Sequence, residues 1–198
     1  EARLETAPLK AALELSEIMI RQFRHSDGGF YLTAADSEAL LYRHIDFYDG
    51  AIPSGNAVAA ANLLRLAHMT GREDLRDEAH GIFRAAAGRV KAHPRGYLAL
   101  LSARDFAAGP VREIVIAGDP EDDGAAAMIK AIRQHYLPRR VLLLHRPDDR
   151  ELAAIAPYID PLRPIDGNAA AYICENHTCA LPVGTVREML ENLGVGKP

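Results

Sequence analysis

The segment 46–56 carries the side chains best suited to bind a polyhydroxylated ligand. It reads Asp-Phe-Tyr-Asp-Gly-Ala-Ile-Pro-Ser-Gly-Asn, a composition dense in turn-forming residues. Asp49, Ser54 and Asn56 together offer hydrogen-bond acceptors and donors that match sugar hydroxyl groups. A structural role competes, because Ser54 or Asn56 is placed to cap the helix that follows and Asp49 to accept from backbone amides. Capping fits the spacing directly, and the two roles are compatible.

Acidic side chains also gather in the loops around this segment. A pair of carboxyl groups about 5–9 Å apart across a sugar pocket supports glycoside hydrolysis, which makes Asp36 and Glu38 further candidates for substrate binding. Both also sit where the first turn of a helix would begin, and there acidic residues compensate the helix dipole. His25 and His44 are candidates for the general base of an epimerase-like reaction, although a lone histidine is more often a helix-end or surface residue. The sequence assigns no catalytic residue.

Three residues near the end of the chain, Cys174, His177 and Cys179, have side chains capable of metal binding or redox chemistry. Structural zinc sites normally use two pairs of ligands, and no second pair or fourth ligand accompanies these three, so we predict no metal site. Structural or inert thiols are the simplest interpretation for an intracellular chain. Cys174 and Cys179 also remain candidates for a redox-labile disulfide.

The turn at 117–120, Ala-Gly-Asp-Pro, follows a predicted strand at a place where parallel sheets bind phosphate. Neither a G-x-G-x-x-G fingerprint nor a P-loop occurs in the sequence. Acidic residues at 121–123 would repel an anion and suit the start of a helix instead. We therefore predict a structural turn and no cofactor.

The first half of the sequence predicts helices that would position these loops. Apolar residues recur at helical spacing over 7–25, 57–69, 75–90 and 97–107, with a short further segment over 36–43. The helix over 57–69 has almost no polar face and should be an inner helix, whereas the one over 75–90 has a single apolar stripe and should be an outer one. Alternating inner and outer helices are typical of an α/α toroid.

The composition changes near residue 110, where we place a domain boundary. Short apolar runs at 113–118, 141–145 and 170–174 predict buried strands. Helical patterns lie between and after them, at 121–135, 149–156 and 185–193. Strands of this kind joined by helical crossovers favour a small, mostly parallel sheet covered by helices.

The composition excludes several function classes. The 198 residues are 48% apolar and 25% charged, enough for a real core, and the net charge of −4 gives no reason to expect nucleic acid or an anionic membrane as a partner. Two cysteines are too few for a secreted domain that is held together by several disulfides. No apolar run approaches the ~20 residues of a membrane helix. We expect a soluble, cytoplasmic chain. Because it begins at Glu1 without a leader pattern, it looks cut from something longer.

Four segments resemble a known family in their order and spacing. They are 27–31 (Asp-Gly-Gly-Phe-Tyr), 46–57, 112–120 (Arg-Glu-Ile-Val-Ile-Ala-Gly-Asp-Pro), and 164–167 (Pro-Ile-Asp-Gly) followed by 171–174 and Cys179. From about Ser26 onward the chain resembles the C-terminal part of the thioredoxin-domain-containing family related to spermatogenesis-associated protein 20, whose bacterial members are the YyaL-like proteins.

The resemblance implies a longer parent protein. It would have an N-terminal thioredoxin-like domain, then an α/α toroid similar to N-acylglucosamine 2-epimerases and six-hairpin glycosidases, then an α/β tail. We therefore expect a mainly α chain with the last toroid hairpins over 1–109 and a small α/β domain over 110–198. The implied function is binding or processing of carbohydrate. The alternative is a non-catalytic scaffold that supports the missing N-terminal region of the same chain, whose thioredoxin-like domain could meet Cys174 and Cys179.

Overall fold

The computed structural model describes residues 1–38 and 40–195, and these fold into two compact units. The helical unit comprises Pro8–Ala67 and Arg72–Gly109. The α/β unit comprises Glu1–Ala7, His68–Gly71 and the chain from Pro110 onward. The chain is thus mainly helical with one small α/β part, as the sequence predicts.

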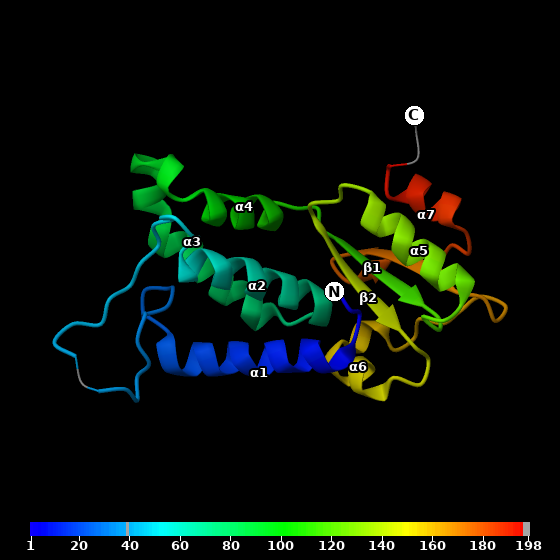
Figure 1. Ribbon diagram of the computed structural model, residues 1–198, viewed down its shortest axis with the longest axis horizontal. Coiled ribbons are helices and arrows are strands. Elements are labelled where there is room, and N and C mark those ends of the chain that lie inside the picture. The colour runs from blue at the N-terminus through cyan, green and yellow to red at the C-terminus, as the bar shows by residue number, and fades with distance from the viewer. Residues whose placement is uncertain (39, 196–198) are drawn as a thin grey trace. The chain divides into compact units, whose positions relative to one another are not determined.

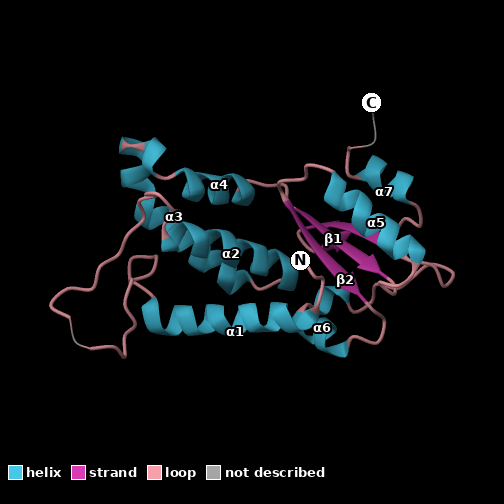
Figure 2. Cartoon of the chain, in the orientation of Figure 1, coloured by secondary structure: helices cyan, strands magenta, loops and turns pink. Residues whose placement is uncertain are grey.

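The four longer helices predicted in the first half are present, within a few residues of the expected bounds (Figure 2). They are α1 (Thr6–Phe23), α2 (Gly55–Thr70), α3 (Glu73–Ala92) and α4 (Leu98–Ala107), with a short 3₁₀ turn, η1 (Pro94–Gly96), before α4. Gly71 links α2 to α3 at a φ of 76°, a conformation that glycine adopts without steric cost.

Burial differs sharply among these helices. In α2 most apolar side chains are buried, Leu63 and Leu64 among them, and α3 buries one stripe that contains Leu75 and Ile82. By contrast, α1 is 18 residues long and buries only Ser16. Because isolated helices draw most of their stability from packing of an apolar face, α1 has less such support from the described residues than α2 and α3 have.

The short segment over 36–43 forms no helix among its described residues; turns and bends occupy it instead. Backbone hydrogen bonds on either side of the segment tie it to other parts of the helical unit. The Ala35 amide donates to the Gln22 carbonyl at 2.8 Å, and the Leu32 amide donates to the His44 carbonyl at 2.9 Å. These bonds fold the segment back toward the end of α1 as an extended loop.

The α/β unit contains a four-stranded sheet in the order β2-β1-β3-β4. Its strands are β1 (Arg112–Ala117), β2 (Arg140–His145), β3 (Ala170–Glu175) and β4 (Thr178–Cys179). Its helices are α5 (Asp123–Gln134), α6 (Arg150–Ile155) and α7 (Val186–Asn192), and a 3₁₀ turn, η2 (Pro157–Ile159), follows α6.

The prediction of a mostly parallel sheet is wrong. Strands β1 and β2 are parallel, joined through α5, but β3 pairs antiparallel with β1 and β4 antiparallel with β3. The apolar run of β3 shows that the strand is buried but carries no information on its direction. The sheet is therefore mixed.

One face of the sheet packs against α5 and α7 (Figure 1). Its core includes Ile114 and Ile116 of β1, Leu142 of β2, Ile132 of α5 and Met189 of α7. Because side chains alternate along a strand, Glu113 and Val115 project from the opposite face. That second face carries the site described below.

Candidate functional site

Asp49 and Ser54 lie together in the loop before α2, and their polar atoms bind the backbone of the protein. One carboxylate oxygen of Asp49 accepts from the Ser54 amide at 2.9 Å, and the other accepts from the Ala99 amide of α4 at 2.8 Å. The hydroxyl of Ser54 accepts from the Ala57 amide at 3.2 Å and so caps α2. These contacts are the ones that the capping role requires.

Asn56 is similarly engaged. Its side chain is almost fully buried, at 1% exposure. The amide oxygen accepts from the Phe30 amide at 2.7 Å, and the amide nitrogen donates to the carbonyls of Phe30 and Asp46 at 2.9 and 2.8 Å. Asn56 therefore joins the start of α2 to two loop segments, and substrate binding by it stays a prediction.

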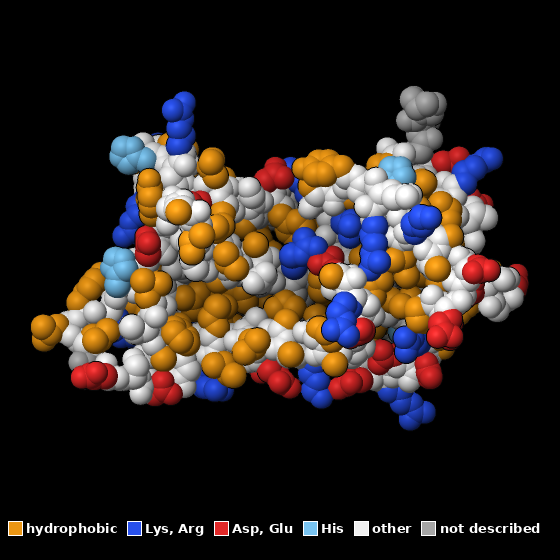
Figure 3. Space-filling view, in the orientation of Figure 1, with side chains coloured by type: hydrophobic (Ala, Val, Ile, Leu, Met, Phe, Trp, Pro, Cys, Tyr) orange, Lys and Arg blue, Asp and Glu red, His pale blue; other side chains and the backbone are white. Residues whose placement is uncertain are grey.

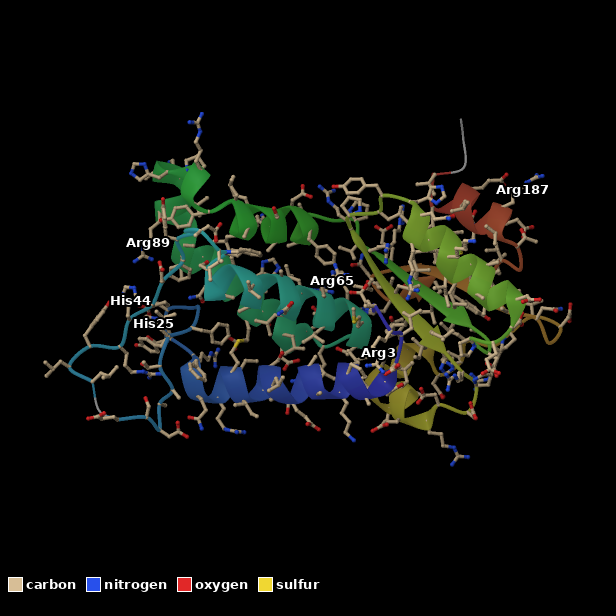
Figure 4. The ribbon with its side chains drawn as sticks, in the orientation of Figure 1. Arg3, His25, His44, Arg65, Arg89 and Arg187 are labelled. Carbon is tan, nitrogen blue, oxygen red and sulfur yellow. A yellow bond between two sulfur atoms is a disulfide. The ribbon has the colours of Figure 1, made fainter. Side chains whose placement is uncertain are left out.

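The other candidates of the helical unit lie in the loop after α1. Asp36 and Glu38 are exposed, and within the described chain no hydrogen bond links either to the loop 46–56. His25 and His44 occupy the same loop region (Figure 4). The ring of His25 accepts from the Asp27 amide at 3.0 Å, and the ring of His44 lies edge-on to that of Tyr42.

Cys174 and Cys179 form a disulfide across the β3–β4 hairpin. They are directly opposite each other in the strand register. Asn176 and His177 at the turn both have positive φ, 51° and 60°, as in a two-residue type I′ turn. Glycine is usual at such positions, because a left-handed conformation costs other residues about 1–2 kcal/mol. The turn therefore holds His177 at a steric cost.

The turn places His177 beside a fully buried acidic residue, Glu113 of β1. One oxygen of Glu113 lies 2.7 Å from Nδ1 of His68, near the end of α2, and the other accepts from the His177 amide at 2.9 Å. Nε2 of His177 lies 3.1 Å from the His68 carbonyl and 4.0 Å from the first Glu113 oxygen. We call Glu113, His68, His177 and Tyr158 the carboxylate cluster.

The hydrogen bonds of the cluster fix where the ring protons sit. An ionised carboxylate can only accept, so Nδ1 of His68 must carry a proton that it donates to Glu113. A carbonyl also only accepts, so Nε2 of His177 must be protonated to bond to His68. Both imidazoles are thereby held in defined orientations around one carboxylate.

Tyr158 of η2 forms the apolar wall of the cluster. Its ring centroid lies 4.8 Å from that of His177, in an edge-to-face arrangement. Its hydroxyl is shielded from solvent and has no hydrogen-bond partner among the described residues. Burial, together with the nearby charge of Glu113, raises the pKa of Tyr158 well above its ordinary value, so it stays a neutral phenol.

A second buried imidazole, His145, ends strand β2. Neither of its ring nitrogens has a hydrogen-bond partner among the described residues. Burial lowers the pKa of His145, and the positive charge of Arg163 lowers it further. His145 is therefore a neutral side chain near pH 7.

Sequence reasoning missed most of this cluster. The sequence points to His177 only beside the cysteines, as a possible metal ligand, and to Glu113 only as the first residue of a strand. The signal that was available is a single acidic residue at the start of an otherwise apolar strand, Glu-Ile-Val-Ile, because a charge in such a strand needs a partner. His68 lies 109 residues before His177, too far for any local spacing rule.

Two findings bear on what the described part of the chain can do. Within it, no group of three or more His, Cys, Asp or Glu side chains has the arrangement to hold a metal ion. Within residues 1–38 and 40–195, no helix combines the length and the apolar character needed to cross a membrane.

Comparison with known proteins adds a relationship. No family model matches the chain. It is 33% identical over 186 residues to human spermatogenesis-associated protein 20 and 34% identical over 189 residues to the rat protein, and both alignments cover 92% of this chain. A Caenorhabditis elegans protein described as uncharacterized protein B0495.5 is 27% identical over 184 residues. The chain spans about a quarter of these relatives' length, 24% for the mammalian proteins. Over most of its length, then, the chain is similar to one stretch of spermatogenesis-associated protein 20.

Proposed function

We propose that this segment is a non-catalytic scaffold whose helical unit packs against the region that precedes it in its longer relatives. The observation that carries the proposal is the distribution of exposed apolar side chains. Of the twelve large ones exposed in the described chain, ten belong to the helical unit. They are Leu15, Ile18, Leu32, Leu40, Leu41, Tyr42, Tyr48, Ile52, Val58 and Leu98, and we call them the exposed apolar set.

Helix α1 contributes the most regular part of this set. Leu15 is 66% exposed and Ile18 42% exposed, and residues three apart lie on the same face of a helix. The other large apolar side chains of α1 are partly buried, so Leu15 and Ile18 form a separate exposed apolar patch in the middle of the helix. A helix of this kind is expected to be covered by other helices in the folded whole.

The loop between α1 and α2 adds a second part. Leu40, Leu41 and Tyr42 are consecutive and exposed, with Leu41 wholly in solvent. Hydrophobic side chains gather over this loop and along α1 in the space-filling view (Figure 3). Large exposed apolar areas usually mark a surface that another protein segment covers.

The polar loop residues support the same proposal. Asp49, Ser54 and Asn56 direct their oxygen and nitrogen atoms to the backbone of the protein rather than to solvent. A sugar would have to compete with those bonds. In the scaffold role these residues hold α2 and α4 in place, and the apolar surface does the binding.

The test is an association experiment. The chain is mixed with the separately produced preceding region of a longer homologue, and binding is measured by calorimetry. We expect binding that Leu15→Glu and Ile18→Glu together weaken at least tenfold, because two carboxylates would be buried unpaired.

Leu181→Glu is the matched control. Leu181 is 88% exposed but lies in the α/β unit, outside the exposed apolar set. It receives the same new charge and should leave binding unchanged. Absence of any association, or equal weakening by the control, would refute the scaffold proposal.

Carbohydrate binding at the loop 46–56 is the alternative that the resemblance to sugar-handling toroids implies. It predicts that saccharides raise the melting temperature of the chain and that Asp49→Ala abolishes the effect. The scaffold role predicts no saccharide effect. It also predicts that Asp49→Ala lowers the unfolding free energy by about 1–3 kcal/mol, because two backbone amides lose their acceptor.

A further inference from the structure

We propose that the Cys174–Cys179 disulfide is a thiol–disulfide exchange site, opened by a dithiol reductant that attacks Cys179, and that opening it releases His177 from the carboxylate cluster. The proposal starts from the place of the disulfide in the sheet. Glu113 is the register neighbour of Cys174, and Cys174 that of Cys179. Directly paired residues project to the same face. The disulfide and the buried carboxylate therefore stand in one row across β1, β3 and β4.

The two cysteines differ in exposure to solvent. Cys174 is fully buried on the inner strand β3, whereas Cys179 is only half-buried on β4, which is the edge strand of the sheet. The neighbouring turn residues Asn176 and Thr178 are exposed. An attacking thiolate is therefore expected to reach the disulfide from the Cys179 side.

The exchange balances as two successive displacements. A thiolate of the dithiol attacks the sulfur of Cys179, the Cys174–Cys179 bond breaks, and Cys174 leaves as a thiolate that takes up a proton. The second thiol of the reductant, as its thiolate, then attacks the reductant's own sulfur in the mixed disulfide, and Cys179 leaves and is protonated. Two electrons pass from the dithiol to the protein, and the reductant ends as a disulfide.

The disulfide closes a very short loop. The two cysteines are five residues apart in a chain of 198. Because the stabilisation by a disulfide grows with the length of the loop that it closes, this one constrains the hairpin far more than the whole fold. Its reduction is thus a local event that leaves β1, β2 and β3 paired.

What the loop constrains is the position of His177. Its left-handed backbone is sterically costly. Three contacts offset this steric cost: the hydrogen bond from the His177 amide to Glu113, the hydrogen bond from its ring to the His68 carbonyl, and the packing of the ring on Tyr158. With the disulfide open, the turn gains freedom to leave that conformation, and Glu113 then loses one of its two donors.

The test has two readouts on the full chain. The first uses the monothiol glutathione and locates its adduct by fragmentation mass spectrometry. We expect the adduct on Cys179 and none on Cys174 under native conditions. An adduct on Cys174, or reaction only after the protein is unfolded, would overturn the proposed site.

The second readout is amide hydrogen exchange at His177, measured before and after reduction by dithiothreitol. We expect exchange to accelerate by up to roughly thirtyfold, the factor by which closure of a loop this short favours the closed turn. The Val115 amide, in the central strand β1, should not change. The double variant Cys174→Ala/Cys179→Ala should show the faster exchange with or without reductant. Full reduction with no change at His177 would show that the disulfide does not control the cluster.

Discussion

Replacing Glu113 by glutamine should destabilise the α/β unit while keeping the size of the side chain. Glu113 is fully buried and accepts one hydrogen bond from a His68 ring nitrogen and another from the His177 amide. Glutamine offers one oxygen and one NH₂ group, so its oxygen can accept from only one of the two donors. If that donor is the His177 amide, His68 stays bonded only when its ring proton moves to Nε2 and Nδ1 accepts from the NH₂ group.

The magnitude follows from these two bonds. A hydrogen bond to a charged group contributes about 1.5–3 kcal/mol, and a buried donor left without a partner costs about 1–3 kcal/mol. In the Glu113→Gln variant both bonds lose their charge assistance, and one of them is lost outright unless the His68 ring changes tautomer. We therefore expect the free energy of unfolding to fall by about 1–3 kcal/mol.

The same substitution on a neighbouring strand provides the control. Glu175 of β3 forms an exposed ion pair with Arg112, and exposed pairs of this kind contribute about 0–1 kcal/mol. Urea unfolding followed by circular dichroism measures both variants. If Glu113→Gln destabilises the protein no more than Glu175→Gln does, the carboxylate cluster does not have the role assigned to it.

Four further substitutions each change a single side chain. Tyr158→Phe should change the melting temperature little or raise it slightly, because the lost hydroxyl has no partner among the described residues. His145→Leu should raise the unfolding free energy by about 1 kcal/mol. Because burial lowers the pKa of His145 below its ordinary value of 6.5, the unfolded chain takes up a proton first as the pH falls. Stability that is present above pH 6.5 is therefore lost in acid, and urea titrations at several pH values should show a smaller loss in His145→Leu. Asn56→Ala should cost at least about 3 kcal/mol in urea unfolding, since two buried hydrogen bonds and one partly buried one are lost, whereas Ser54→Ala should cost only about 1 kcal/mol as the loss of a helix cap.

The elements that the sequence predicts well are those with a periodic apolar pattern. The runs over 57–69 and 75–90 predict α2 and α3, and the patterns at 149–156 and 185–193 predict α6 and α7. Where periodicity is absent the prediction fails. No helix forms over the described part of 36–43, and nothing in the run at 170–174 tells that β3 is antiparallel.

The candidate site is only partly predictable for a different reason. Cys174 and Cys179 are close in sequence, and so their pairing is among the outcomes that the sequence allows. The carboxylate cluster joins three distant parts of the chain, the end of α2, strand β1 and the hairpin turn. Sequence spacing carries no information on such contacts. The local indication of the cluster is a charged residue in an apolar strand. It shows that the charge needs partners but does not identify which residues they are.

Hydrogen exchange of α1 tests the scaffold account most directly. Exchange is measured on this chain alone and with the preceding region of a longer homologue added, with the amides of β1 as an internal reference. Because α1 buries only Ser16, we predict fast exchange in the chain alone and clear slowing of α1 and of the loop around Leu41 in the mixture. Unchanged exchange of α1 in a mixture where the two parts are bound would contradict the account.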